Sequence, residues 1–152
     1  MARKNTIILK KYVDIYDERV AAAALSPGHL LELTSANKVQ KHSTAGGNHA
    51  RLIATEDGLR GNGVDVAFEA NDPIQVATML PGEIALMRLK NGENVVIGDF
   101  LESAGDGTLQ KHVIDSTGDY FTNNLVAVAE EAVDMSGSDG EDPDGYIKVR
   151  FI

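Results

Sequence analysis

The sequence of 152 residues contains no cysteine, no tryptophan and only four prolines. Without cysteine the chain has no disulfide, no thiolate zinc site and no thiol nucleophile. No run of about 18 apolar residues occurs, so the sequence predicts no transmembrane helix and we expect no membrane partner. A chain of this length has room for one domain with a hydrophobic core that needs no covalent cross-link.

Basic residues are scarce. The chain has 14 Lys and Arg against 23 Asp and Glu, which gives a net charge of −9. Phosphate contacts need Lys and Arg, and base stacking needs aromatic side chains, of which there are four Phe and four Tyr, so nucleic acid is disfavoured as a partner. The charge is uneven: the first dozen residues are basic and the region from Glu130 to Asp144 is acidic. Either both are solvated surfaces, or a basic arm meets an acidic patch on a neighbouring molecule.

Motifs that carry chemistry are also missing. Gly61-Asn62-Gly63 is not followed by the residues of a phosphate-binding loop, and Ser138 does not lie in a nucleophile elbow. His42 and His49 flank a turn without an acid between them, too few ligands for zinc. The acidic segment 139–145 lacks the spacing of a calcium loop. We therefore expect no catalytic residue, no cofactor and no metal, and a protein that is not an enzyme.

Two β-hairpins in tandem are predicted between Glu83 and Val113. Asn91-Gly92 separates a strand at 83–89 from one at 95–101, and this dipeptide favours the type I′ turn of a tight hairpin. Gly105-Asp106-Gly107 then turns the chain into a strand at 108–113. A meander this dense indicates a small all-β domain.

Alternation with a period of two continues on both sides of this block. It predicts strands at 6–9, 29–33, 38–43, 50–55, 64–68, 74–78 and 146–152. Residues 17–25 suit a short helix, with acidic residues first and alanines after them, and residues 116–124 suit a loop. Residues 125–133 fit either a helical stripe or a strand buried on both faces, and the all-β context favours the strand. Nine or ten short strands at this spacing are typical of a sandwich or barrel.

The order of several short motifs resembles one known family, the decoration or cement proteins of tailed-phage capsids. The resemblance covers residues 25–134, and its evidence is the succession of motifs, since each alone is ordinary turn chemistry. The motifs are Leu25-Ser26-Pro27-Gly28, Ala50-Arg51-Leu52-Ile53-Ala54 with Glu56-Asp57, Pro81-Gly82-Glu83, Gly98-Asp99-Phe100-Leu101-Glu102, Asp106-Gly107-Thr108-Leu109 and the run 126–132.

The resemblance implies a small β-barrel or β-tulip-like domain at 25–152, with an acidic loop at 135–145 and an extended N-terminal arm at 1–24. It implies a homotrimer that binds the major capsid protein on the outside of an expanded head, clamps neighbouring coat subunits and is assembled in the bacterial cytoplasm. The arm would supply the partner-binding residues, which are Arg3, Lys4, Ile7, Ile8, Leu9, Lys10 and Lys11.

Two alternatives stay open. One is another virion or tail component built on a β-barrel. The other is a hammerhead-type carrier or a small-molecule-binding β module, since Val96-Ile97-Gly98-Asp99 is similar to a turn of biotinyl domains. Such carriers place a lysine between methionines at a hairpin tip, and this sequence has no such lysine.

Overall fold

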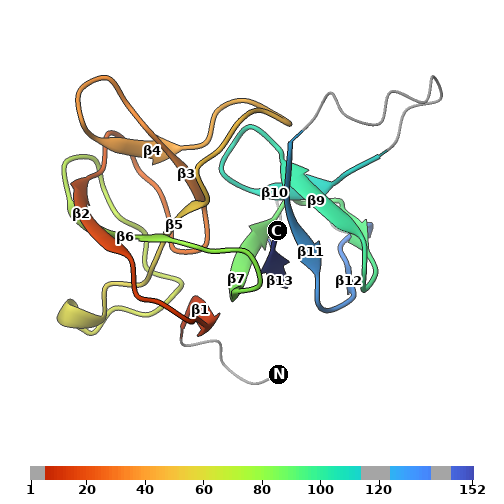
Figure 1. Ribbon diagram of the computed structural model, residues 1–152. Helices are drawn as coiled ribbons and strands as arrows, with labels where there is room; N and C mark the ends of the chain where they lie inside the picture. The colour runs from red at the N-terminus through yellow and green to blue at the C-terminus, as the bar shows by residue number, and fades with distance from the viewer. Residues whose placement is uncertain (1–5, 114–123, 138–144) are drawn as a thin grey trace.

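The computed structural model describes residues 6–113, 124–137 and 145–152, and in these ranges the chain forms β-strands and one short 3₁₀ helix, η1 (Gly58–Arg60). Figure 1 shows the strands gathered into two bodies side by side. None of the helical structure in the described ranges is long and apolar enough to cross a membrane. The predicted fold class, all-β with a small barrel, is confirmed.

Five strands form a closed barrel. Each pairs with the next, and the last pairs back with the first. In spatial order they are β7 (Ile84–Leu89), β10 (Leu109–Lys111), β9 (Phe100–Ser103), β11 (Leu125–Ala129) and β13 (Gly145–Phe151). The last strand shows the alternation that the sequence predicts, because Ile147, Val149 and Phe151 are buried while the residues between them are not.

The second body is a sheet of five antiparallel strands. Their spatial order is β2 (Tyr16–Val20), β6 (Pro73–Thr78), β5 (Leu52–Ala54), β3 (Leu30–Leu33) and β4 (Val39–Lys41). A parallel bridge between Ala21 and Val39 joins its two edge strands, and the N–H of Ala22 donates to the carbonyl of Val39 over 2.8 Å. The sheet therefore curls around its own buried cluster, which includes Leu31, Phe68 and Val76.

The N-terminal residues are built into both bodies. β1 (Ile8–Lys10) pairs with β7 and extends the barrel sheet, and β2 pairs with β6 over five residues. Ile7 is fully buried in the barrel core. In the described part of the chain, residues 6–24 thus lie along the domain instead of extending from it.

The two bodies share a core, and Arg88 makes hydrogen bonds to both. The barrel cluster also contains Leu30, Ile53 and Met79, which come from the second sheet or directly follow it. The Arg88 side chain leaves β7, donates to the carbonyls of Pro27 and Val64, and contacts the hydroxyl of Tyr146. The bodies therefore form one continuous packing unit.

The predicted helix at 17–25 is wrong. Residues 16–20 form β2 instead, and the N–H groups of Ala21 and Ala22 donate to carbonyls of other segments. Pairing with β6 and burial of Ala21 thus outweigh the helix propensity of the alanine run.

The predicted strand at 64–68 is also wrong. Val64 and Phe68 are buried but Val66 is exposed, and this segment pairs only through an isolated bridge from Phe68 to Leu25.

The hairpin predicted at Asn91-Gly92 is wrong as well. Gly92 has a φ of +89°, but Asn91 does not share the positive φ that a type I′ turn requires. The chain beyond this turn enters β8 (Asn94–Val95), which pairs with β12 (Val133–Asp134) and not with β7.

The second predicted hairpin is confirmed, since β9 and β10 pair in antiparallel register around Gly105-Asp106-Gly107. Residues 125–129 are the strand that the all-β context favoured, whereas the loop predicted at 116–124 lies almost wholly outside the described residues, as does most of the acidic segment at 135–145.

Candidate interaction surface

The structure separates the residues predicted to bind a partner. Arg3 and Lys4 lie outside the described residues, Ile7 is part of the core, and Ile8 is half-buried. Leu9 and Lys10 are exposed, and the Lys10 ammonium lies 5.8 Å from the centre of the Tyr12 ring. Lys11 is almost fully buried. Only part of the predicted segment therefore faces solvent.

A buried carboxylate holds the segment that follows. Glu83, in the turn between β6 and β7, has no exposed surface, and its Oε2 lies 3.1 Å from the Lys11 ammonium. Its other oxygen accepts hydrogen bonds from the backbone N–H groups of Tyr12, at 3.1 Å, and Val13, at 3.5 Å. The N–H of Leu80 donates to Oε2 over 3.0 Å. One carboxylate thus fixes the backbone of a segment about 70 residues away in the sequence.

The charge of Glu83 is maintained by these contacts. Burial acts to raise the pKa of the carboxyl, but the N–H of Leu80, the Lys11 ammonium and the N–H of Tyr12 outweigh it and hold that pKa below its usual range. The ammonium has a second acceptor in the carbonyl of Thr78, at 2.9 Å. The carboxyl group is therefore ionised at neutral pH, and its contact with Lys11 is well supplied with hydrogen bonds, as a buried ion pair must be.

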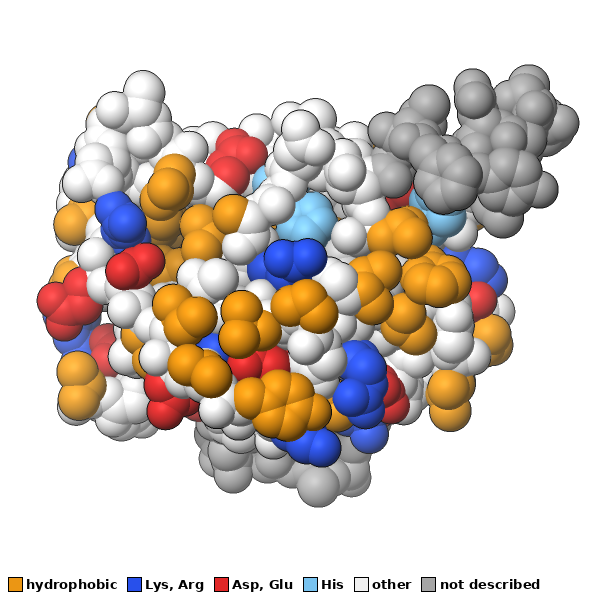
Figure 2. Space-filling model, in the orientation of Figure 1, with side chains coloured by type: hydrophobic (Ala, Val, Ile, Leu, Met, Phe, Trp, Pro, Cys, Tyr) orange, Lys and Arg blue, Asp and Glu red, His pale blue; other side chains and the backbone are white. Residues whose placement is uncertain are grey.

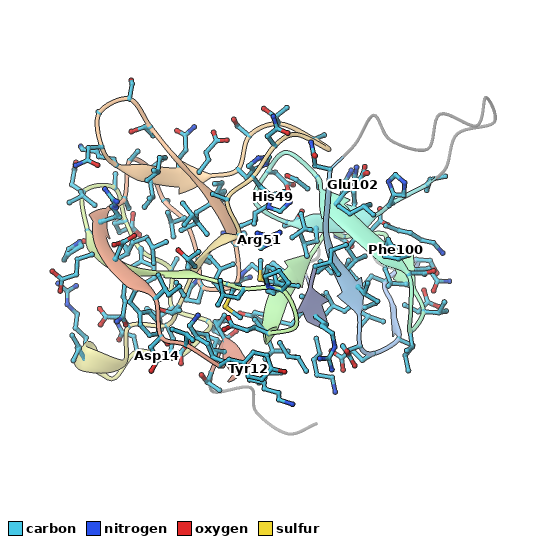
Figure 3. The ribbon with its side chains drawn as sticks, viewed as in Figure 1. Tyr12, Asp14, His49, Arg51, Phe100 and Glu102 are labelled. Carbon is cyan, nitrogen blue, oxygen red and sulfur yellow. The ribbon has the colours of Figure 1, made fainter. Side chains whose placement is uncertain are left out.

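The segment held in this way, residues 11–15, is called the strap below. Its apolar side chains point outward: Tyr12 is 61% exposed, Val13 53% and Ile15 38%. Figure 3 shows Tyr12 and Asp14 at the edge of the molecule, next to β1. A rigid backbone that presents three apolar side chains to solvent has the character of a preformed contact surface.

The apolar surface continues from the strap onto the barrel. Figure 2 shows hydrophobic side chains spread across this side of the molecule, over both bodies. Tyr12 lies next to Gly82, whose carbonyl accepts a hydrogen bond from Arg150. On β11, Val128 is the register partner of both Arg150 and the exposed Phe100. We call this continuous area, from Tyr12 through Arg150 and Val128 to Phe100, the strap face.

Side chains of the β4–β5 connection make hydrogen bonds between the two bodies. His49 contacts the carbonyl of Leu125 at 3.1 Å, and Arg51 donates to the carbonyl of Ile152 at 2.8 Å. Figure 3 shows both residues between the second sheet and the barrel. Arg51 has a φ of +53°, an unusual conformation for a residue with a side chain. These contacts stitch the second sheet to β11 and to the C-terminal residue.

The described residues contain no group of side chains that is recognisable as a catalytic or metal-binding site. They contain no group of three or more His, Asp and Glu side chains placed to hold a metal ion. Both nitrogens of the buried His42 imidazole are occupied, by the Ser103 hydroxyl and the Asn48 carbonyl, each at 2.7 Å. His29 is buried and accepts a hydrogen bond from the N–H of Ser26 at 3.0 Å. Burial, with Lys41 and Arg88 nearby, lowers the pKa of His29 to about 3, so its imidazole is neutral.

Sequence reasoning did not identify the exposed residues of the strap. The strap residues Tyr12, Val13 and Ile15 stand in a stretch without a clear period, so nothing marked them as exposed. The signal that could have identified them is the presence of several apolar residues in an irregular segment that directly follows a basic segment. Glu83 follows a Pro-Gly turn, where an exposed carboxylate is the ordinary expectation.

Comparisons with known proteins give a likeness in fold. No protein-family model matches the sequence, and no curated protein is similar to it. Among solved structures, the chain is similar to the N base of the head fiber protein gp8.5 of bacteriophage phi29. The TM-score is 0.56 at 11% sequence identity, and the superposition covers 92% of this chain and 95% of that one. The likeness shows a shared fold across nearly the whole of both chains.

Proposed function

We propose that this chain is a structural component of a phage virion, located on the outside of the head. The observation that carries the proposal is the fold shared with the N base of a phage head fiber, which extends over nearly the whole chain. The motif order that resembles capsid decoration proteins supports the same class from the sequence. A structural role also agrees with side chains that serve the fold, such as those of His42 and Glu83.

The strap face is the part that we assign to the capsid. Its partner is the major capsid protein, and Leu9 and Lys10 of the predicted segment border it. Because the Glu83 carboxylate already fixes the strap backbone, binding costs little further conformational entropy there. Apolar contact by Tyr12 and Val13 supplies the affinity, whereas Lys11, held by Glu83, contributes through the shape of the strap.

On the capsid, we assign the molecule the role of a clamp between neighbouring coat subunits, acting as a homotrimer. A repeating lattice favours this arrangement, because linked weak contacts exceed a single contact in affinity by about 10²–10⁴. Each copy then needs only a modest apolar patch and no deep pocket. This finer proposal rests on the family resemblance and on the exposed strap face.

A sedimentation experiment tests the proposal. Purified protein is mixed with expanded heads and with unexpanded proheads of the phage that encodes it, and the bound fraction is measured after centrifugation. We expect saturable binding to expanded heads, and loss of at least tenfold in affinity for Val13→Asp. The matched control is Leu33→Asp, which should bind normally, because Leu33 lies on β3 of the second sheet and is 54% exposed against 53% for Val13. Absence of binding by the unmodified protein would reject the proposed function.

A further inference from the structure

A groove of about 530 Å³ lies beside the strap, between the edge strands and the η1 segment. β1 and β2 form one side of it, and the residues from Thr55 to Arg60 form the other. Figure 1 shows η1 and β1 below β2, on the lower part of the molecule. The floor contains the buried side chains of Phe68 and Ile74. It is therefore an apolar channel that opens to solvent.

The rim offers an exposed apolar anchor. Leu59, in the middle of η1, is fully exposed, and Tyr16 of β2 is 38% exposed. η1 is nevertheless ordered by local bonds, because the Asp57 side chain accepts from the N–H of Arg60 and Gly61 closes the turn in the left-handed region. The fully exposed Leu59 side chain contributes nothing to the buried core of the described residues, and it lines the groove. It is therefore available to an apolar side chain of a molecule lying there.

The charges at the rim are mostly negative. Among the described residues, Glu18, Glu56 and Asp57 line the groove, against one cation, Arg60. Asp57 is paired with Arg60, and Glu56 uses one oxygen to accept the N–H of Ile7. Within the described residues, Glu18 has no ion-pair partner. The groove therefore favours a ligand that carries Lys or Arg.

The groove also borders an open strand edge. β1 is the terminal strand of its sheet, paired on one side only with β7, and Ile8 of β1 lines the groove. An exposed edge offers N–H and C=O groups to an added strand, whose alternate side chains then enter a neighbouring channel. This geometry suits an extended backbone and does not suit a helix.

We propose that this groove binds an extended peptide segment of a partner protein, in which apolar residues alternate with Lys or Arg. The backbone lies along β1, and the apolar side chains enter the channel over Phe68 and Ile74. The basic side chains between them point out of the channel, and their long stems bend back to bring the cations to Glu18 and Glu56 at the rim. The site is separate from the strap face and does not depend on the proposed virion role. A partner can thus be held at two places, by a surface contact and by a threaded segment.

The test uses the full chain and a defined probe, a fluorescein-labelled, end-blocked octapeptide of alternating valine and lysine. Its matched control replaces the lysines with glutamates. Anisotropy titrations at low salt should show saturable binding of the basic probe only, and raising the salt should weaken it, since exposed charge pairs are screened. In amide spectra of the labelled protein, the basic probe should shift the signals of Ile8, Thr55 and Leu59.

Two variants locate the site. Leu59→Asp and Glu18→Lys both change exposed side chains, so we expect each protein to remain folded. Leu59→Asp should weaken the basic probe at least fivefold, and Glu18→Lys two- to fivefold, the range of an exposed charge pair. Leu33→Asp, an exposed residue outside the groove, should leave the affinity unchanged. Equal binding of both peptides, no binding of either, or shifts confined to the strap face would overturn the proposal, whatever the outcome of the capsid experiment.

Discussion

Replacing Glu83 with alanine should cost this protein a large part of its stability. The substitution leaves the ammonium of Lys11, whose side chain is 5% exposed, with the carbonyl of Thr78 as its acceptor among the described residues. It also removes the acceptor of the N–H groups of Tyr12 and Leu80. Removing one partner of a buried ion pair typically costs about 3–5 kcal/mol. Since a domain of this kind is stable by only about 5–15 kcal/mol, the loss is at least about a fifth of the total.

The assays are urea denaturation and thermal unfolding, both followed by far-UV circular dichroism, since the chain lacks tryptophan. The melting temperature should fall by roughly 6–20 °C, at about 2–4 °C per kcal/mol for a domain of this size. Glu69→Ala, which removes an exposed carboxylate, is the control and should change the free energy of unfolding by less than about 0.5 kcal/mol.

A second variant separates the ion pair from general damage to the core. In Lys11→Met/Glu83→Gln both charges are removed and a hydrogen-bond acceptor is retained, so the double variant should recover at least half of the loss seen in Glu83→Ala. If Glu83→Ala were no more destabilising than Glu69→Ala, the strap would not depend on this carboxylate, and the argument for a fixed contact surface would fail.

Three further predictions concern pH, backbone geometry and binding. The pKa of His29 is about 3 in the folded protein and 6.5 in the unfolded chain. The contribution of His29 to stability is therefore fully present above pH 6.5 and is lost as the pH falls toward 3. The free energy of unfolding, measured by urea titration, should be about 2 kcal/mol lower at pH 5 than at pH 7, and His29→Asn should reduce this difference. Gly107→Ala should destabilise the protein by about 1–3 kcal/mol in the same assay, since Gly107 has a φ of +86° and a Cβ there would lie 3.2 Å from the His29 ring. Val13→Asp should keep the melting temperature of the unmodified protein within about 2 °C, because Val13 is exposed, and a larger fall would mean that its effect on capsid binding reports unfolding.

The sequence predicted the barrel well where local pattern and tertiary pairing agree. The alternation at 146–152 identified β13, and the Gly105-Asp106-Gly107 turn identified the β9–β10 hairpin. It failed where pairing partners are distant. Residues 17–25 have good helix propensity, yet β6, more than 50 residues away, supplies the hydrogen bonds that make a strand.

Asn91-Gly92 shows the same limit for turns. The dipeptide was correctly taken as a turn, but only the φ of Asn91 distinguishes a type I′ hairpin from the turn that sends the chain into β8. The candidate surface was predictable to the level of a segment. Basic and apolar residues marked the N-terminal region, but the burial of Lys11 and the exposure of Val13 depend on Glu83, and no local pattern connects these residues.

The measurement that most directly tests the central proposal is the binding of the purified protein to expanded heads, compared for the unmodified chain, Val13→Asp and Leu33→Asp. The account predicts saturable binding of the unmodified chain and of Leu33→Asp, with binding at least tenfold weaker for Val13→Asp. Failure of the unmodified chain to bind heads would contradict the virion role. Equal binding by all three proteins would keep that role and contradict the assignment of the strap face as the capsid contact.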